Sequence, residues 1–100
     1  MVNNELEYII CSAIYYNDEV KREHQPMNID YGIVICGRRH HNCFIILKEI
    51  FKDNYKKYLM IQGFITSKDR FVNREEANKI AFDSGQVKYF TTKLISEDLY

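Results

Sequence analysis

Two short runs of β-branched and aromatic residues constrain the fold of this chain more than any other feature of its sequence. The first spans residues 8–16 and ends at Asn17-Asp18, and the second spans residues 31–36 and ends at Gly37. Such residues favour strands, and Asn, Asp and Gly favour the turns that end them. Neither run approaches the roughly 20 apolar residues that span a bilayer. The two runs therefore predict strands of a soluble sheet, with no membrane span.

Two further segments have the pattern of helices that pack on such a sheet. In the segment 41–52, apolar residues recur at helical spacing. The segment 74–84 has signals for the start and the end of a helix. Asn73 is a suitable N-cap, and Glu76 follows it at the spacing of a capping box. Gly85 suits the C′ position, just after the last helical residue. Both segments are predicted to be helices.

The remaining segments complete a mixed fold. Residues 57–66 predict a third strand, in which Gly63 marks a bulge or a point of close approach. Residues 19–30 are read as a short strand and a loop, and the amphipathic tail 87–100 as holding a short strand. The order strand, strand, helix, strand, helix predicts an α+β fold, an antiparallel β-sheet with two α-helices packed on one face. Residues 1–100 are expected to form a single domain.

Composition excludes several classes of function. Lys and Arg number 14 and so do Asp and Glu, so the chain lacks the basic excess of a protein that binds DNA or RNA polymers. The three cysteines, Cys11, Cys36 and Cys43, have no CxxC spacing and indicate free thiols in a reducing cytosol. The N-terminus lacks the pattern of a signal peptide. A small anionic ligand remains compatible with this balance, because it needs only a few local cations.

The segment Gly37-Arg38-Arg39-His40-His41 is the strongest chemical feature of the sequence, because it lies between a buried strand and the start of a helix. Helix N-termini attract anions through free N–H groups and partial positive charge, and guanidinium groups match phosphate oxygens. Cations at a helix start oppose the helix dipole, so a sequence that keeps them there is expected to use them. The structural alternative is that both arginines are solvated or paired with carboxylates.

Two other interpretations of this segment are weaker. Adjacent His40 and His41 do not point the same way, and with His24 they lack an acidic group at ligand spacing, so no metal site is expected. Cys43 lies near both histidines in sequence but begins an apolar helix face, where a packed cysteine is more usual than a nucleophile. No catalytic residue is therefore assigned.

A second constellation follows the third strand and leads into the second helix. An aromatic ring can stack on a base, arginines can hold phosphates, and an Asn side chain can bind a base or ribose edge. The structural alternative divides the segment into core aromatics, a helix cap and surface arginines. The candidate ligand-binding residues here are Phe64, Thr66, Arg70, Phe71, Asn73 and Arg74.

Three blocks of the sequence together resemble a group of small phage and prophage proteins. They are GRRHHNCF at 37–44, QGFITSKDRFVNREEANKIAFDSGQ at 62–86 and SEDLY at 96–100, about half of the chain. On these blocks the chain is similar to the first family of Thoeris anti-defence proteins, viral sponges for cyclic ADP-ribose signals. The resemblance implies a nucleotide-binding domain that sequesters a cyclic ADP-ribose-type signal without cleaving it, in the cytoplasm of the infected bacterial host.

The resemblance also implies partners and roles. Members assemble as dimers and higher homo-oligomers, up to hexamers, and some hold cyclic di- or trinucleotides at a separate site. No cofactor is implied. By residue type, Phe64 and Asn73 fit the adenine of the cyclic ADP-ribose-type ligand, and Arg70 and Arg74 fit its phosphates. Arg38 or Arg39 fits either this site or the separate site for cyclic oligonucleotides.

Two other functions stay open at this stage. One is a small phosphodiesterase-like hydrolase that uses His40 or His41 as acid and base. The other is a protein–protein inhibitor that acts through a surface rich in the 8 tyrosines. The aromatic and apolar content also predicts at least a homodimer, because a chain this short does not readily bury it alone.

Overall fold

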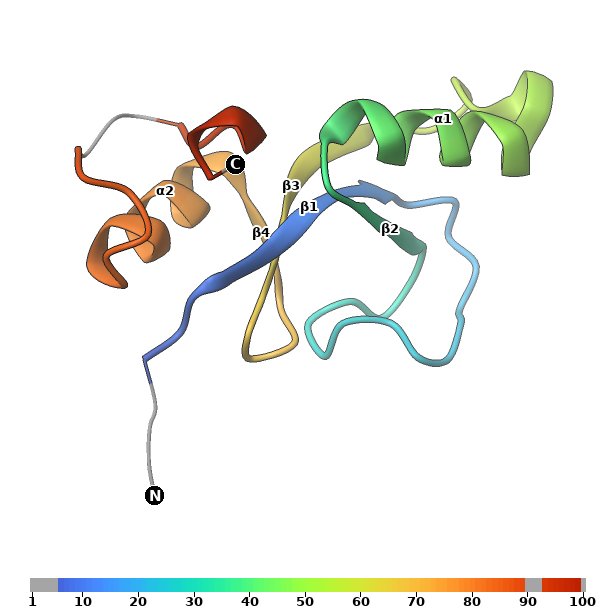
Figure 1. Ribbon diagram of the computed structural model, residues 1–100. Coiled ribbons are helices and arrows are strands. Elements are labelled where there is room, and N and C mark those ends of the chain that lie inside the picture. The colour runs from blue at the N-terminus through green and yellow to red at the C-terminus, as the bar shows by residue number, and fades with distance from the viewer. Residues whose placement is uncertain (1–5, 90–92, 100) are drawn as a thin grey trace.

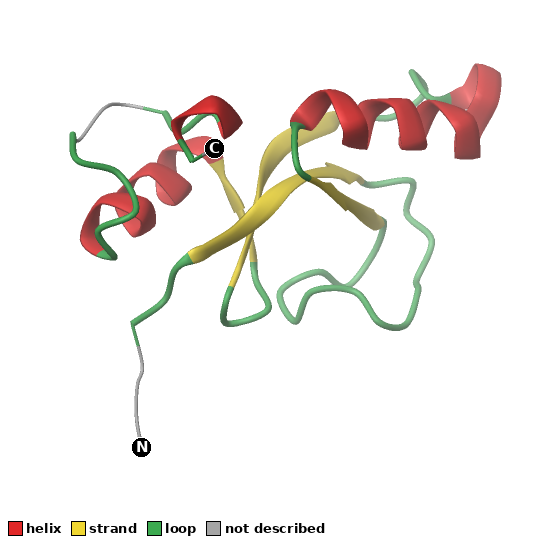
Figure 2. Cartoon of the chain, in the orientation of Figure 1, coloured by secondary structure: helices red, strands yellow, loops and turns green. Residues whose placement is uncertain are grey.

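The computed structural model describes residues 6–89 and 93–99. Within those residues the chain forms a four-stranded sheet, two α-helices and two 3-10 turns. No helix in this described part is long and apolar enough to cross a membrane. In chain order the elements (Figures 1 and 2) are β1 Ile9–Tyr16, β2 Ile33–Gly37, α1 His40–Phe51, η1 Lys52–Asn54, β3 Met60–Thr66, β4 Phe71–Asn73, α2 Arg74–Asp83 and η2 Ser96–Asp98.

The sheet has the strand order β2-β1-β3-β4, and every neighbouring pair is antiparallel. Ser12 lies opposite Phe64 of β3, and Ile14 lies opposite Ile35 of β2. Because side chains alternate along a strand, Ser12 and Ile14 point to the same face. Ile14 packs under α1 and Phe64 packs under α2, so both helices cover one face. The predicted α+β fold is confirmed.

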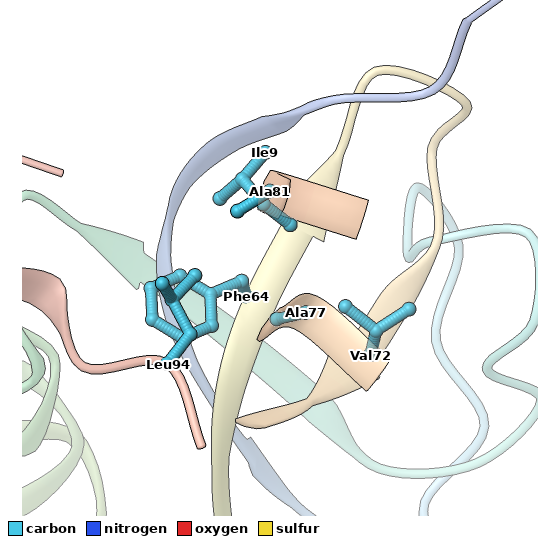
Figure 3. Close-up of a cluster of buried hydrophobic side chains, with 6 residues drawn as sticks. All are labelled: Ile9, Phe64, Val72, Ala77, Ala81 and Leu94. Atoms are coloured by element: carbon cyan, nitrogen blue, oxygen red, sulfur yellow. The ribbon is translucent and has the colours of Figure 1, made fainter. Parts of the chain in front are cut away.

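The core consists of two clusters between the sheet and its helices. The cluster under α1 contains Ile14, Tyr16, Ile35, Cys43 and Leu47. The cluster under α2 (Figure 3) contains Ile9, Phe64, Val72, Ala77, Ala81 and Leu94. Ala77 and Ala81 form a narrow face of α2, and their small side chains bring the helix close to the strands. Each large apolar side chain buried in this way stabilises the fold by about 1.5–3 kcal/mol.

Two side-chain amides form hydrogen bonds with backbone groups of strands that have no partner strand at that position. The Asn28 amide donates to the Phe71 carbonyl at 2.8 Å, and Phe71 N–H donates to Asn28 Oδ1 at 2.9 Å. Gln86 makes the same two bonds with Ile9, at 2.7 and 2.8 Å, beside the bulge in β1. Unpaired strand edges favour aggregation, and these amides protect them.

Several local predictions differ from the structure. The short strand expected within 19–30 is absent, because that segment is a loop in which the Arg22 guanidinium binds both carboxylate oxygens of Asp18. The third strand begins at Met60 rather than at residue 57, and β4 was not predicted, since three residues show no alternation. No strand forms in the described part of the tail, 87–89 and 93–99; the rest of that prediction, at 90–92, lies outside the described residues.

Gly63 is a point of close approach, as the sequence indicates, but its neighbour is another strand. A Cβ at this position would lie 2.0 Å from the Val72 carbonyl oxygen and 2.7 Å from the Phe71 ring. The missing side chain therefore lets β4 pack against β3. This close approach is between two strands rather than between the chain and a ligand.

Candidate anion-binding site

The start of α1 is fixed to the middle of the sheet by His40. This side chain is 8% exposed, and its Nε2 lies 2.7 Å from the Gly63 carbonyl oxygen. Because a carbonyl only accepts, Nε2 carries the proton and donates it. Burial is the main cause that lowers the pKa of His40, with the charge of Arg74 adding to it. His40 is therefore a neutral imidazole that anchors the helix start.

The start of α2 lies beside the same glycine. Asn73 pairs with Gly63 across β3 and β4, and its Oδ1 accepts from the Glu76 N–H at 2.8 Å, so the predicted N-cap is confirmed. Arg74, the first residue of the helix, donates to the Gln62 side-chain oxygen. Its Nε–H is buried and has no hydrogen-bond partner among the described residues. Arg74 itself is half-buried, and a guanidinium with a buried, spare N–H donor is a suitable partner for an anion.

The C-terminal segment forms the third side of this site. Leu94 is buried, and its N–H donates to the Arg74 carbonyl at 3.0 Å. Glu97 then places its carboxylate 3.6 Å from the Arg39 guanidinium. Figure 1 shows η2 lying between the starts of α1 and α2. We call this meeting point the helix-start junction, formed by Arg39, His40, Gln62, Arg74 and Glu97.

The helix-start junction unites the two constellations that the sequence separates. It contains Arg39 and His40 from the first and Arg74 from the second. Two helix N-termini add partial positive charge to the two guanidinium groups. The site is therefore chemically suited to an anion such as a phosphate. The three sequence blocks 37–44, 62–86 and 96–100 all contribute to it.

The side chains of His41 and His40 lie in different places. Neighbouring residues of a helix point about 100° apart, and His41 lines a separate groove of about 550 Å³ with Phe44, Lys48 and Tyr55. Arg38 is exposed, and its carbonyl accepts from the Ser12 hydroxyl. Neither side chain is part of the junction.

Arg70 is held by carboxylates instead of facing an open site. Its Nε and Nη2 each lie 2.9 Å from a Glu7 oxygen, and Nη2 is also 3.1 Å from Glu76. The hydrogen bond from Arg70 is the main cause that lowers the pKa of Glu7. Thr66, buried at the end of β3, donates to the same carboxylate at 2.5 Å. In this structure both side chains are engaged by carboxylates, and their roles as ligand-binding residues stay predictions.

The two candidate aromatic rings are core residues. Phe64 is 0% exposed, with its ring edge-on to His40, and Phe71 is 8% exposed and packs on Tyr15. Their faces are not available to an adenine in this structure. Asn73 uses its side-chain oxygen to cap α2. Packing and capping engage these side chains in this structure, and the role of Phe64, Phe71 and Asn73 in framing a base stays a prediction.

Metal ligands and the Cys43 thiol are the two other chemistries considered for the first segment. No group of three or more metal-ligating side chains occurs within residues 6–89 and 93–99. Cys43 is buried, and burial raises its pKa to about 11. Its thiol bonds the Ser12 and Arg39 carbonyls.

Sequence reasoning missed two members of the junction, Gln62 and Glu97. Both stand inside the blocks that carry the phage resemblance, which was the available signal. Neither has a local pattern of its own, because each is brought to the site by tertiary contacts.

Comparison with known proteins gives one finding. No curated protein and no solved structure matches the chain. Residues 8–100 match the family described as Phage T4 y16D protein, so that nearly the whole chain, including every residue of the helix-start junction, is covered. The chain belongs to the phage T4 y16D protein family.

Proposed function

We propose that this phage-family protein binds a compact anionic nucleotide of the cyclic ADP-ribose type at the helix-start junction and holds it without cleaving it. The observation that carries the proposal is that Arg39 and Arg74 each stand at a helix start. The charges of Arg74 and Glu97 both act on the anchored His40, and Glu97 pairs with Arg39. Two guanidinium groups beside two helix N-termini suit the paired phosphates of a diphosphate.

The charge already at the site is compatible with this ligand. Glu97 is 68% exposed and its carboxylate is 3.6 Å from Arg39. The Arg39 side chain is 30% exposed, so the pair lies at the surface on its Glu97 side. Surface ion pairs contribute about 0–1 kcal/mol, so a phosphate can displace the carboxylate at small cost. The buried Nε–H of Arg74 gains a partner when an anion enters.

The state of His40 favours binding over hydrolysis. Its Nε2 proton is donated to a backbone carbonyl, and the lowered pKa keeps the ring neutral. An imidazole engaged in this way is a poor proton donor to a leaving group. Together with the family of phage proteins and the resemblance to Thoeris sponges, this supports sequestration of a host defence signal in the infected cell.

We further propose that the protein acts as a homo-oligomer. The sheet face opposite the helices carries Tyr15 with its cross-strand neighbours Val34 and Ile61. Ile61 is 38% exposed, and the other two are half-buried. A second copy can cover these side chains. Light scattering at micromolar concentration tests this, and a monomer mass of 12.0 kDa would contradict it.

The experiment for the function incubates the protein with cyclic ADP-ribose isomers, removes unbound ligand, denatures the protein by heat and analyses the supernatant. A sponge depletes the ligand and returns it intact. Recovery of a hydrolysed product indicates an enzyme, and no depletion indicates an inhibitor that acts on a protein. Either of these two results would overturn the proposal.

A further inference from the structure

Glu97 is the one carboxylate among the five residues of the helix-start junction, and it lies close to the cations. Its carboxylate is 3.6 Å from the Arg39 guanidinium, and its side chain is exposed. The charges of Glu97 and Arg74 both act on the buried His40. A negative charge at this place opposes the binding of a phosphate, so a site for phosphates alone does not account for it.

Backbone contacts hold Glu97 in place independently of its own side chain. Leu94 is buried, and its N–H donates to the Arg74 carbonyl at 3.0 Å. In the turn that follows, the Asp98 N–H donates to the Ile95 carbonyl at 3.0 Å, and the Asp98 carboxylate accepts from the Ile95 N–H at 3.1 Å. The Glu97 side chain can therefore exchange partners while the segment that carries it stays docked on the start of α2.

The donors and acceptors of the junction indicate which partner the carboxylate takes. Surface ion pairs are weak, so an entering phosphate can replace Glu97 on the Arg39 guanidinium. The displaced carboxylate then lies beside the phosphate and can only accept hydrogen bonds, whereas guanidinium groups and helix N-terminal N–H groups only donate. Sugar hydroxyls next to a phosphate are donors that suit such an acceptor, as in dinucleotide-binding folds, where an acidic residue bonds a ribose hydroxyl.

We propose that Glu97 forms a sugar subsite of the helix-start junction, in which its two carboxylate oxygens accept from neighbouring hydroxyls of a ribose whose phosphates are held by Arg39 and Arg74. This inference rests on the proposed function and narrows its ligand class. A sugar phosphate gains charge-assisted hydrogen bonds to Glu97. Pyrophosphate has no hydroxyl to donate and is only repelled. The subsite therefore favours nucleotides with ribose hydroxyls over inorganic phosphates.

The test uses calorimetry with two kinds of probe on the folded parent and on Glu97→Gln. The cyclic ADP-ribose isomers carry ribose hydroxyls, and inorganic pyrophosphate carries none. Glu97→Gln is expected to weaken binding of the isomers about tenfold, because a charge-assisted hydrogen bond becomes a neutral one. The same change should strengthen binding of pyrophosphate by up to about fivefold, since it removes a like charge at the surface. The two affinities thus move in opposite directions.

Glu49→Gln is the matched control. Glu49 is also an exposed carboxylate in a surface ion pair, 3.4 Å from Lys52, but it lies near the opposite end of α1. This variant removes the same net charge as Glu97→Gln and should leave both affinities unchanged. A change in both affinities here would mean that net charge, rather than the place of Glu97, controls binding, and would overturn the subsite.

Two kinds of failure can be told apart. If the parent binds the isomers but Glu97→Gln moves both affinities in the same direction, or moves neither, the sugar subsite is wrong while the proposed function stands. If the parent binds none of the isomers, the proposed function itself fails, and the sugar subsite fails with it.

Discussion

His40 Nε2 donates to the Gly63 carbonyl across 2.7 Å, and this one hydrogen bond ties the start of α1 to the middle of β3. The start of α2 lies beside the same glycine, through the pairing of Gly63 with Asn73. The bond therefore helps to hold the two cationic helix starts beside the same glycine. Its loss should affect both stability and ligand affinity.

The first prediction concerns the stability that this bond provides. His40→Ala leaves the Gly63 carbonyl without its partner in a buried position, which should destabilise the fold by about 1–3 kcal/mol. His40→Gln, which can keep an N–H donor at that place, should lose less. Urea denaturation followed by circular dichroism measures both. His41→Ala is the matched control at an exposed position and should change stability by less than about 0.5 kcal/mol.

The second prediction concerns pH. Since burial lowers the pKa of His40 below its ordinary value of 6.5, the unfolded chain binds this proton more readily than the folded one. Stability should therefore be unaffected above pH 6.5 and should fall as the pH drops from 6.5 toward the folded pKa. Denaturation at pH 7.5 and 5.5 measures the slope. In His40→Gln the slope over this window should flatten; an unchanged slope would mean that another group is responsible.

The third prediction concerns Arg70. Arg70→Ala should cost about 1 kcal/mol, in keeping with a partly exposed pair, while leaving nucleotide affinity unchanged. In the parent protein, Arg70 lowers the pKa of Glu7 from 4.5, so this stabilisation is present above pH 4.5 and lost as the pH falls through the folded pKa. Acid titration of the variant should show a smaller loss. A large drop in affinity would instead return Arg70 to the ligand site.

Local features of this fold were predictable from the sequence. Asn73 caps α2 and Gly85 ends it at φ +81°, because both roles depend on residues within one helical turn. Helix α1 follows from apolar residues at helical spacing. Strand β4 was not predicted, because three residues show no periodicity. The backbone of its first residue is hydrogen-bonded by Asn28, which is far away in sequence.

The candidate site was predictable only in part. The sequence indicates that Arg39 and Arg74 stand at helix starts, but their meeting depends on a contact between residues 23 positions apart. Arg70 and Phe64 looked equally suitable by residue type. Glu7 engages the first, and the packing of α2 buries the second. Cys36 ends an apolar run of the sequence but is exposed in the structure, whereas Ala13, directly opposite it, is buried.

The most direct measurement of the central claim is isothermal titration calorimetry of cyclic ADP-ribose isomers against Arg39→Ala/Arg74→Ala. Charge-assisted hydrogen bonds contribute roughly 1.5–3 kcal/mol each, so losing both should weaken binding by about two to four decades. The matched control, Arg22→Ala/Arg70→Ala, removes the same charge from the two carboxylate-bound arginines and should bind like the parent. If the folded Arg39→Ala/Arg74→Ala variant binds as tightly as the parent, or if the parent binds no isomer, the helix-start junction is not a nucleotide site.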